Sequence, residues 1–181
     1  MKRIGFAALA GVLAGSVAQA ADLSRYTSVN DKKACAYAHS KAGDDGPESC
    51  EFSCKGPVAG VSTKLLSCSD YEHLFVKLDG RSYSTWQAMT AVGGFSGLAN
   101  KNGMVEWVFA GGAAPSRGSL KGLIVRFQGA DAGSGKSRNA LTVIALTPGE
   151  PCWKGNYPTN EAARAALDEA RCQSPLAEEG R

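Results

Sequence analysis

The chain has 181 residues, of which 44% are hydrophobic and 20% are charged, and its formal net charge is +3. It is too short for a multidomain assembly, and too apolar and too weakly charged for a disordered chain. Its first 20 residues contain two basic residues, Lys2 and Arg3, and no acidic residue, so without them the net charge falls to +1. This nearly neutral charge does not favour nucleic acid as a partner.

A basic start, an apolar run and a small-residue site follow one another at the beginning of the chain. Lys2-Arg3 precedes the uncharged run 4–17, and Ala18-Gln19-Ala20 has the A-x-A form of a cleavage site. The run is shorter than the roughly 20 residues that span a bilayer. Ser16 stands where a lipoprotein would carry its lipid-bearing Cys. We therefore expect residues 1–20 to be a Sec-type signal peptide, and the protein to be periplasmic or secreted with no membrane anchor.

The cysteines are the strongest structural signal after this leader. All six lie beyond residue 20: Cys35, Cys50, Cys54, Cys68, Cys152 and Cys172. Export would bring them into a compartment in which disulfides persist, and an even count allows full pairing. Their distribution favours two bridges among the first four cysteines and one bridge between Cys152 and Cys172.

A metal-binding interpretation competes for part of this set. Cys50 and Cys54 are spaced C-x3-C, and with His39 or His73 they could bind Cu(I), which prefers thiolate ligands and accepts imidazole. Neither histidine has ligand-like spacing to this pair, so structural disulfides are the favoured interpretation. We predict no metal site and no cofactor.

The first predicted elements are a strand and a hairpin. Val61–Leu66 alternates in polarity and predicts a short strand. A second alternating run at 73–78 ends at Asp79-Gly80, which predicts a tight hairpin turn. Ser84 and Gln87 have the spacing of a capping box, which predicts a short helix over 85–92.

Three further strand regions follow. Residues 95–99 and 104–109 flank Asn102-Gly103 and predict a second hairpin. Residues 120–128 alternate, and residues 139–147 are nearly all apolar, which predicts a strand in the centre of its sheet.

A helix with an N-cap at Thr159 or Asn160 is the clearest helical prediction, since Glu161 suits its first turn. We expect Arg164 and Asp168 to pair along its outer face. The polar residues that follow the helix predict a frayed tail.

These elements predict an α+β fold of a single domain. We expect an antiparallel β-meander of about five or six strands with a short inserted helix and a C-terminal helix, held by disulfides. The expected divisions are a signal peptide at 1–20, a Cys-rich segment at 21–69, an α+β core at 70–173 packed with it as one domain, and a tail at 174–181.

The sequence contains neither a G-x-S-x-G nor an S-x-x-K motif. The leading hypothesis is a soluble exported protein that binds a macromolecular partner in the cell envelope, such as an inhibitor or accessory protein. Trp153 and Tyr157, which flank the last cysteine loop, are the expected contact surface. One alternative is an envelope hydrolase with His73 as its general base. The other is a Cu(I)-binding protein using Cys50 and Cys54.

Overall fold

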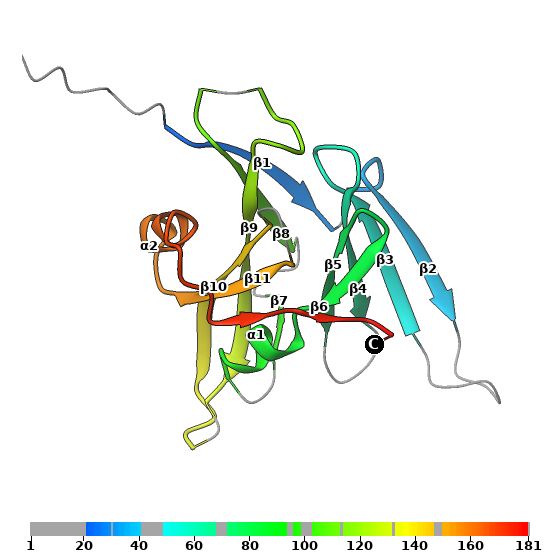
Figure 1. Ribbon diagram of the computed structural model, residues 1–181. Helices are drawn as coiled ribbons and strands as arrows, with labels where there is room; N and C mark the ends of the chain where they lie inside the picture. Colours follow the sequence, from blue (N-terminus) through cyan, green and yellow to red (C-terminus); the bar gives the residue numbers. More distant parts are fainter. Residues whose placement is uncertain are drawn as a thin grey trace, which may run out of the picture.

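Two antiparallel sheets and two short helices make up the described part of the chain (Figure 1). The computed structural model describes residues 21–29, 31–40, 49–67, 72–93, 96–98, 103–112, 114–131, 133–146 and 150–180. The fold is therefore mostly β and contains more strands than the expected five or six.

The first sheet has the strand order β1-β8-β9-β10-β11-β12, with β7 beside β9. Its strands are β1 (Leu23–Ser28), β7 (Ser96–Leu98), β8 (Met104–Phe109), β9 (Leu120–Ala130), β10 (Ser137–Ala145), β11 (Cys152–Tyr157) and β12 (Ser174–Pro175). The apolar strand β10 lies inside the sheet, between β9 and β11, as its composition predicts.

The predicted hairpin between β7 and β8 is wrong. Both strands pair with the long strand β9, with Leu98 opposite Phe127 and Val105 opposite Val125. The 11 residues of β9 give room for both strands along one of its edges. Of the expected turn at 100–103, only Gly103 belongs to the described residues, and its φ is 40°.

The second sheet has the strand order β13-β6-β5-β4-β3-β2. Its strands are β2 (Cys35–Ser40), β3 (Ser49–Lys55), β4 (Val61–Ser67), β5 (His73–Leu78), β6 (Arg81–Ser84) and β13 (Ala177–Glu178). The predicted hairpin of β5 and β6 is confirmed. Its turn places Asp79 at φ 50° and Gly80 at φ 84°, which is the left-handed region that these two residue types tolerate.

The sheets pack face to face over one hydrophobic core. Leu74 and Val76 of the second sheet are fully buried in the same cluster as Trp107, Phe109 and Val125 of the first. The buried indole of Trp107 donates its N–H to the hydroxyl of Thr27 at 3.1 Å, so β1 is tied to the core by a polar contact as well. Alternate residues of each strand thus point inward and fill the core between the sheets.

Helix α2 (Asn160–Ala166) covers the outer face of the first sheet. Its N-cap is Thr159, one of the two predicted residues, and the Thr159 hydroxyl accepts the N–H of Ala162 at 3.2 Å. Ala163 and Leu167 pack there in a second buried cluster that includes residues of β9 and β10.

The expected pair of Arg164 and Asp168 is wrong. Arg164 lies 2.7 Å from the carboxylate of Glu106 on β8, while Asp168 pairs with Lys121 on β9. The Glu106 side chain is only 9% exposed, so it offers a fixed partner that an exposed neighbour on the same helix does not.

The capping-box prediction for the short helix α1 (Trp86–Thr90) is also wrong. The N-cap residue is Thr85, and its side chain makes no capping hydrogen bond. Ser84 belongs to strand β6, where its hydroxyl lies beside His73 and accepts the N–H of Trp86, the first helical residue, so it precedes the N-cap and does not form the predicted capping box.

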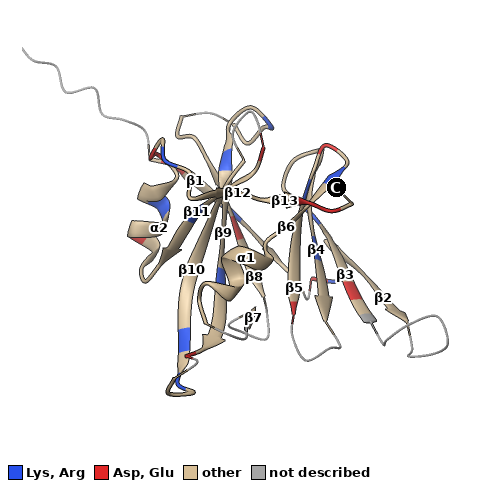
Figure 2. Ribbon diagram, turned by 60° about the horizontal axis from the view of Figure 1, so that its bottom comes forward, with Lys and Arg blue, Asp and Glu red and all other residues tan. Residues whose placement is uncertain are grey.

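The last residues form two short strands and are not a frayed tail. Strand β12 pairs with β11 in the first sheet, and β13 pairs with β6 in the second. Leu176 lies between them, 7% exposed and within the core cluster. Figures 1 and 2 show this chain passing from one sheet to the other. We call Ser174–Glu178 the closing segment, and because it follows α2, that helix does not end the fold.

Disulfides connect neighbouring parts of each sheet. The predicted bridge from Cys152 to Cys172 is confirmed, and Cys35 is bonded to Cys54 across β2 and β3. Cys50 is disulfide-bonded as well, while Cys68 lies outside the described residues. Of the described helices, neither has the length and the hydropathy that crossing a bilayer demands.

Candidate functional site

His73, the candidate general base, lies on the outer face of the second sheet beside a serine hydroxyl. Its Nε2 is 2.9 Å from Oγ of Ser84 on the neighbouring strand β6. The hairpin register explains this proximity, because Ser84 lies opposite Phe75, which shares a face with His73. The Ser84 oxygen also accepts the backbone N–H of Trp86 at 3.2 Å, so the hydroxyl proton can point at the imidazole.

Aromatic rings surround this imidazole on two sides. The ring centres of Phe75 and Trp86 lie 4.0 Å and 5.4 Å from that of His73. Burial lowers the pKa of His73, the charge of Glu179 opposes that effect, and the charge of Lys64 adds to it. His73 is therefore a neutral base at neutral pH. Among the described residues no carboxylate hydrogen-bonds its ring, which leaves a pair of residues rather than a triad.

The cysteine geometry bears on the copper hypothesis. Cys54 is bonded to Cys35, and Cys50 is also in a disulfide, so neither sulfur is a thiolate in this state. Tyr37 donates its hydroxyl proton to the Cys50 sulfur at 3.3 Å. Among the described residues, no group of three His, Cys, Asp or Glu side chains is placed to hold a metal ion.

Trp153 and Tyr157, the expected contact pair, are half-buried. Trp153 packs against the core between the sheets, and Tyr157 packs against the cluster under α2. The Tyr157 hydroxyl donates to the carbonyl of Lys154 at 3.2 Å, and burial raises its pKa. Both rings therefore contribute to packing and are less exposed than expected, while their role as a contact surface stays a prediction.

A polar cavity of about 890 Å³ lies beside α2, and ion pairs occupy its lining. Lys121 pairs with Asp22 at 2.6 Å and also with Asp168. At the same end of the sheet, Arg164 binds Glu106 and donates to the Tyr26 hydroxyl at 3.2 Å. Because these opposite charges are matched within the protein, the cavity offers little net charge to a ligand.

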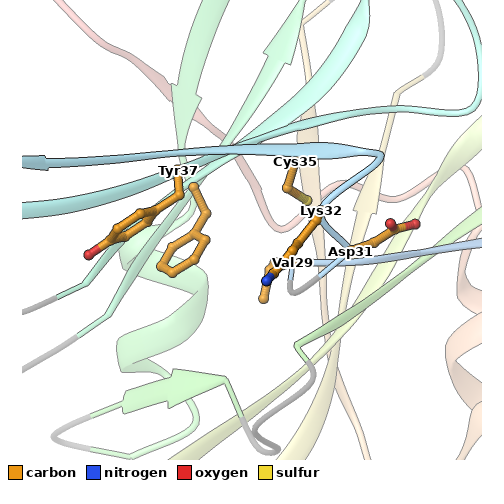
Figure 3. A pocket seen from close by; sticks show the side chains of 6 residues that line it. Val29, Asp31, Lys32, Cys35 and Tyr37 are labelled. Atoms are coloured by element: carbon orange, nitrogen blue, oxygen red, sulfur yellow. The ribbon is translucent and has the colours of Figure 1, made fainter.

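An apolar cavity of about 350 Å³ opens where β1 leads into β2 (Figure 3). We call it the β2 pocket, and it is lined by Val29, Asp31, Lys32, Cys35, Tyr37 and Phe52. The rings of Tyr37 and Phe52 are in contact, with their centres 4.8 Å apart. Phe52 is half-buried and packs against the core, whereas Tyr37 is 57% exposed, the largest exposed fraction among the large hydrophobic residues described.

This pocket was missed at the sequence level, although a signal for it exists. In Cys35-Ala-Tyr-Ala-His-Ser40 the large side chains alternate with small ones, as in a strand with one functional face. Because alanine and serine are not typical strand residues, this alternation was not interpreted as a strand. Comparison with protein-family models, with curated proteins and with solved structures finds no match for this chain.

Proposed function

We propose that the protein is an exported, disulfide-stabilised binding protein that holds a macromolecular partner of the cell envelope at the β2 pocket. The observation that carries this proposal is the exposed Tyr37 ring, which contacts the tilted ring of Phe52 beside an apolar cavity. Tyrosine is enriched among the residues that dominate binding energy, because its ring gives a large contact area at a low cost in conformational entropy.

Two further features support the proposal. Disulfides persist in oxidising compartments, which fits export by a leader at 1–20. The core shared by both sheets fits a single domain that presents the pocket on a rigid framework.

Site-specific photo-crosslinking in the producing cells tests this function. With benzoylphenylalanine in place of Lys32, at the rim of the pocket, we expect one discrete adduct with an envelope macromolecule. Adding Tyr37→Asp should lower the adduct yield at least about tenfold, since it places a charge on the apolar contact. The control carries the same photo-reactive residue in place of Glu161, which is exposed on α2 and outside the pocket lining. Equal adducts at both positions, or no adduct at Lys32, would contradict the proposal.

A second candidate function is hydrolysis at Ser84, which the 2.9 Å approach of His73 to its hydroxyl favours. Here His73 would take the Ser84 proton as the oxygen attacks an ester carbonyl and return it to the alcohol as the ester C–O bond breaks, which leaves an acyl group on Ser84 that water then hydrolyses. A fluorophosphonate probe should then label Ser84 in the wild type, weakly in His73→Ala, and not in Ser84→Ala.

The pH profile sharpens this test. Burial lowers the pKa of His73, so its imidazole stays uncharged from about pH 8 down to its ordinary titration range. Labelling should therefore be constant there and fall only as the pH drops through the lowered pKa of His73. If the folded wild type is not labelled, hydrolysis at Ser84 is contradicted, and the contact between His73 and Ser84 is a structural hydrogen bond.

A further inference from the structure

The closing segment shows how this fold accepts an extended chain at the edges of its sheets. Ser174 pairs with Trp153 at the edge of the first sheet, and Ala177 pairs with Ser84 at the edge of the second. Between them Leu176 enters the core, and its N–H donates to the carbonyl of Pro151 at 2.9 Å. One extended segment with one apolar side chain thus closes this side of the sandwich.

The opposite side of the sandwich has no such segment among the described residues. The sheet orders end there at β1 and β2, which pair only with β8 and β3. The β2 pocket opens at this side, since it is lined by residues that lie between β1 and β2, by the first half of β2 and by the adjacent strand β3. The two sides of the sandwich therefore differ, with an apolar opening where the closing segment has no counterpart.

The six described residues of strand β2 carry none of the sequence features by which proteins protect exposed edges. Such edges are usually very short, or carry charges or proline that prevent pairing with another chain. β12 and β13 are two residues long and β1 contains Arg25. β2 has six residues with no Lys, Arg, Asp, Glu or Pro, and Figure 2 shows the strand free of charge colour. This edge is suited to pairing.

The pairing register of β2 with β3 determines which backbone groups of β2 point toward its open edge. The N–H of Lys55 donates to the carbonyl of Ala34 at 2.8 Å, and Ala36 lies opposite Ser53, two residues further along the same ladder. Antiparallel pairs alternate between hydrogen-bonded and non-hydrogen-bonded types. The N–H and C=O of Tyr37 therefore point away from β3, toward the open edge, and could hold both backbone groups of a residue placed opposite.

We infer that an extended segment of the partner protein adds to the edge of β2 as a new strand and places an apolar side chain in the β2 pocket. The residue opposite Tyr37 carries this side chain, because directly paired residues project from the same face of a sheet. Main-chain hydrogen bonds supply affinity, and the pocket selects the side chain. This inference rests on the proposed function and adds the partner class and the binding mode.

Selection of peptides against the purified protein provides the probe. Phage displaying random decapeptides would be selected on the wild type, with prior depletion on the Tyr37→Pro variant. Proline at this position removes the outward N–H and leaves the β3 ladder intact, so the variant should fold. We expect selected peptides with apolar residues at alternating positions, which add protection from hydrogen exchange at the amide of Tyr37.

N-methylation of a selected peptide then tests the backbone pairing. Methylation of the residue that faces Tyr37 should weaken binding at least about tenfold, since it removes a hydrogen bond and obstructs the approach of the two strands. Methylation of the next residue, whose N–H points away from β2, should change the affinity less than about twofold. Tyr37→Ala is the matched control for Tyr37→Pro, because both lose the ring but only proline loses the N–H.

The outcomes separate the inference from the proposed function. A specific crosslink at Lys32 together with equal effects of both methylations, or with no selected peptide, would overturn strand pairing and leave the binding function standing. Absence of the crosslink would contradict the function itself. Sedimentation of the protein alone should show a monomer. A dimer that Tyr37→Pro dissociates would assign the β2 edge to a second copy and overturn the partner segment.

Discussion

Replacing Leu176 by alanine should lower the free energy of unfolding by about 2 to 3 kcal/mol, because it leaves a cavity in the core between the sheets. Leu176 is 7% exposed and belongs to the main cluster, although it lies five residues from the end of the chain. Urea unfolding followed by tryptophan fluorescence measures the change. The large effect of a near-terminal residue is what distinguishes the closing segment from a frayed tail.

Leu66→Ala is the matched control, since it is the same substitution at a half-buried position of β4 outside the core clusters. We expect it to cost about 1 kcal/mol or less, because it removes less buried surface. If Leu176→Ala and Leu66→Ala have the same small effect, the closing segment does not contribute to the core in solution.

Removal of the Cys152–Cys172 bridge by double alanine substitution should cost about 3 kcal/mol. The bridge closes a loop with a sequence separation of 20, and cross-linking such a loop restricts the unfolded chain. Denaturant unfolding under non-reducing conditions provides the measurement. The same substitution of Cys35 and Cys54 is an instructive comparison, because their separation is 19.

The loop contribution is nearly equal for the two bridges, but their surroundings differ. Cys54 is 1% exposed within the core cluster, whereas Cys172 is exposed. Removing Cys35 and Cys54 should therefore cost about 1 kcal/mol more, through lost packing. A loss below about 1 kcal/mol for Cys152 and Cys172 would contradict the loop-closure argument.

The elements that sequence predicted best are those with local signals. The β5–β6 hairpin follows from Asp79-Gly80, and α2 follows from an N-cap whose partner lies three residues away. The Cys152–Cys172 bridge followed from the distribution of the cysteines. These contacts join residues that are close in sequence, so composition and spacing can encode them.

What sequence did not predict depends on distant contacts. Arg164 pairs with Glu106 across 58 positions rather than with its helical neighbour Asp168. The division into two sheets likewise depends on which strand lies opposite which, and the pairing of Ala177 with Ser84 has no local signature. The proximity of Ser84 to His73 could have been predicted from the sequence, because the register of the predicted hairpin places both side chains on one face.

The closing segment also has a consequence for the order of folding. Strand β6 gains its second neighbour only from Ala177–Glu178, so both sheets keep an incomplete edge until residues 174–178 have been synthesised. Pairing over such long sequence separations requires loop closure before any contact is gained, which slows folding. Chains that stop before residue 174 should therefore collapse without completing either edge, and should be more readily cleaved by proteases than the chain of 181 residues.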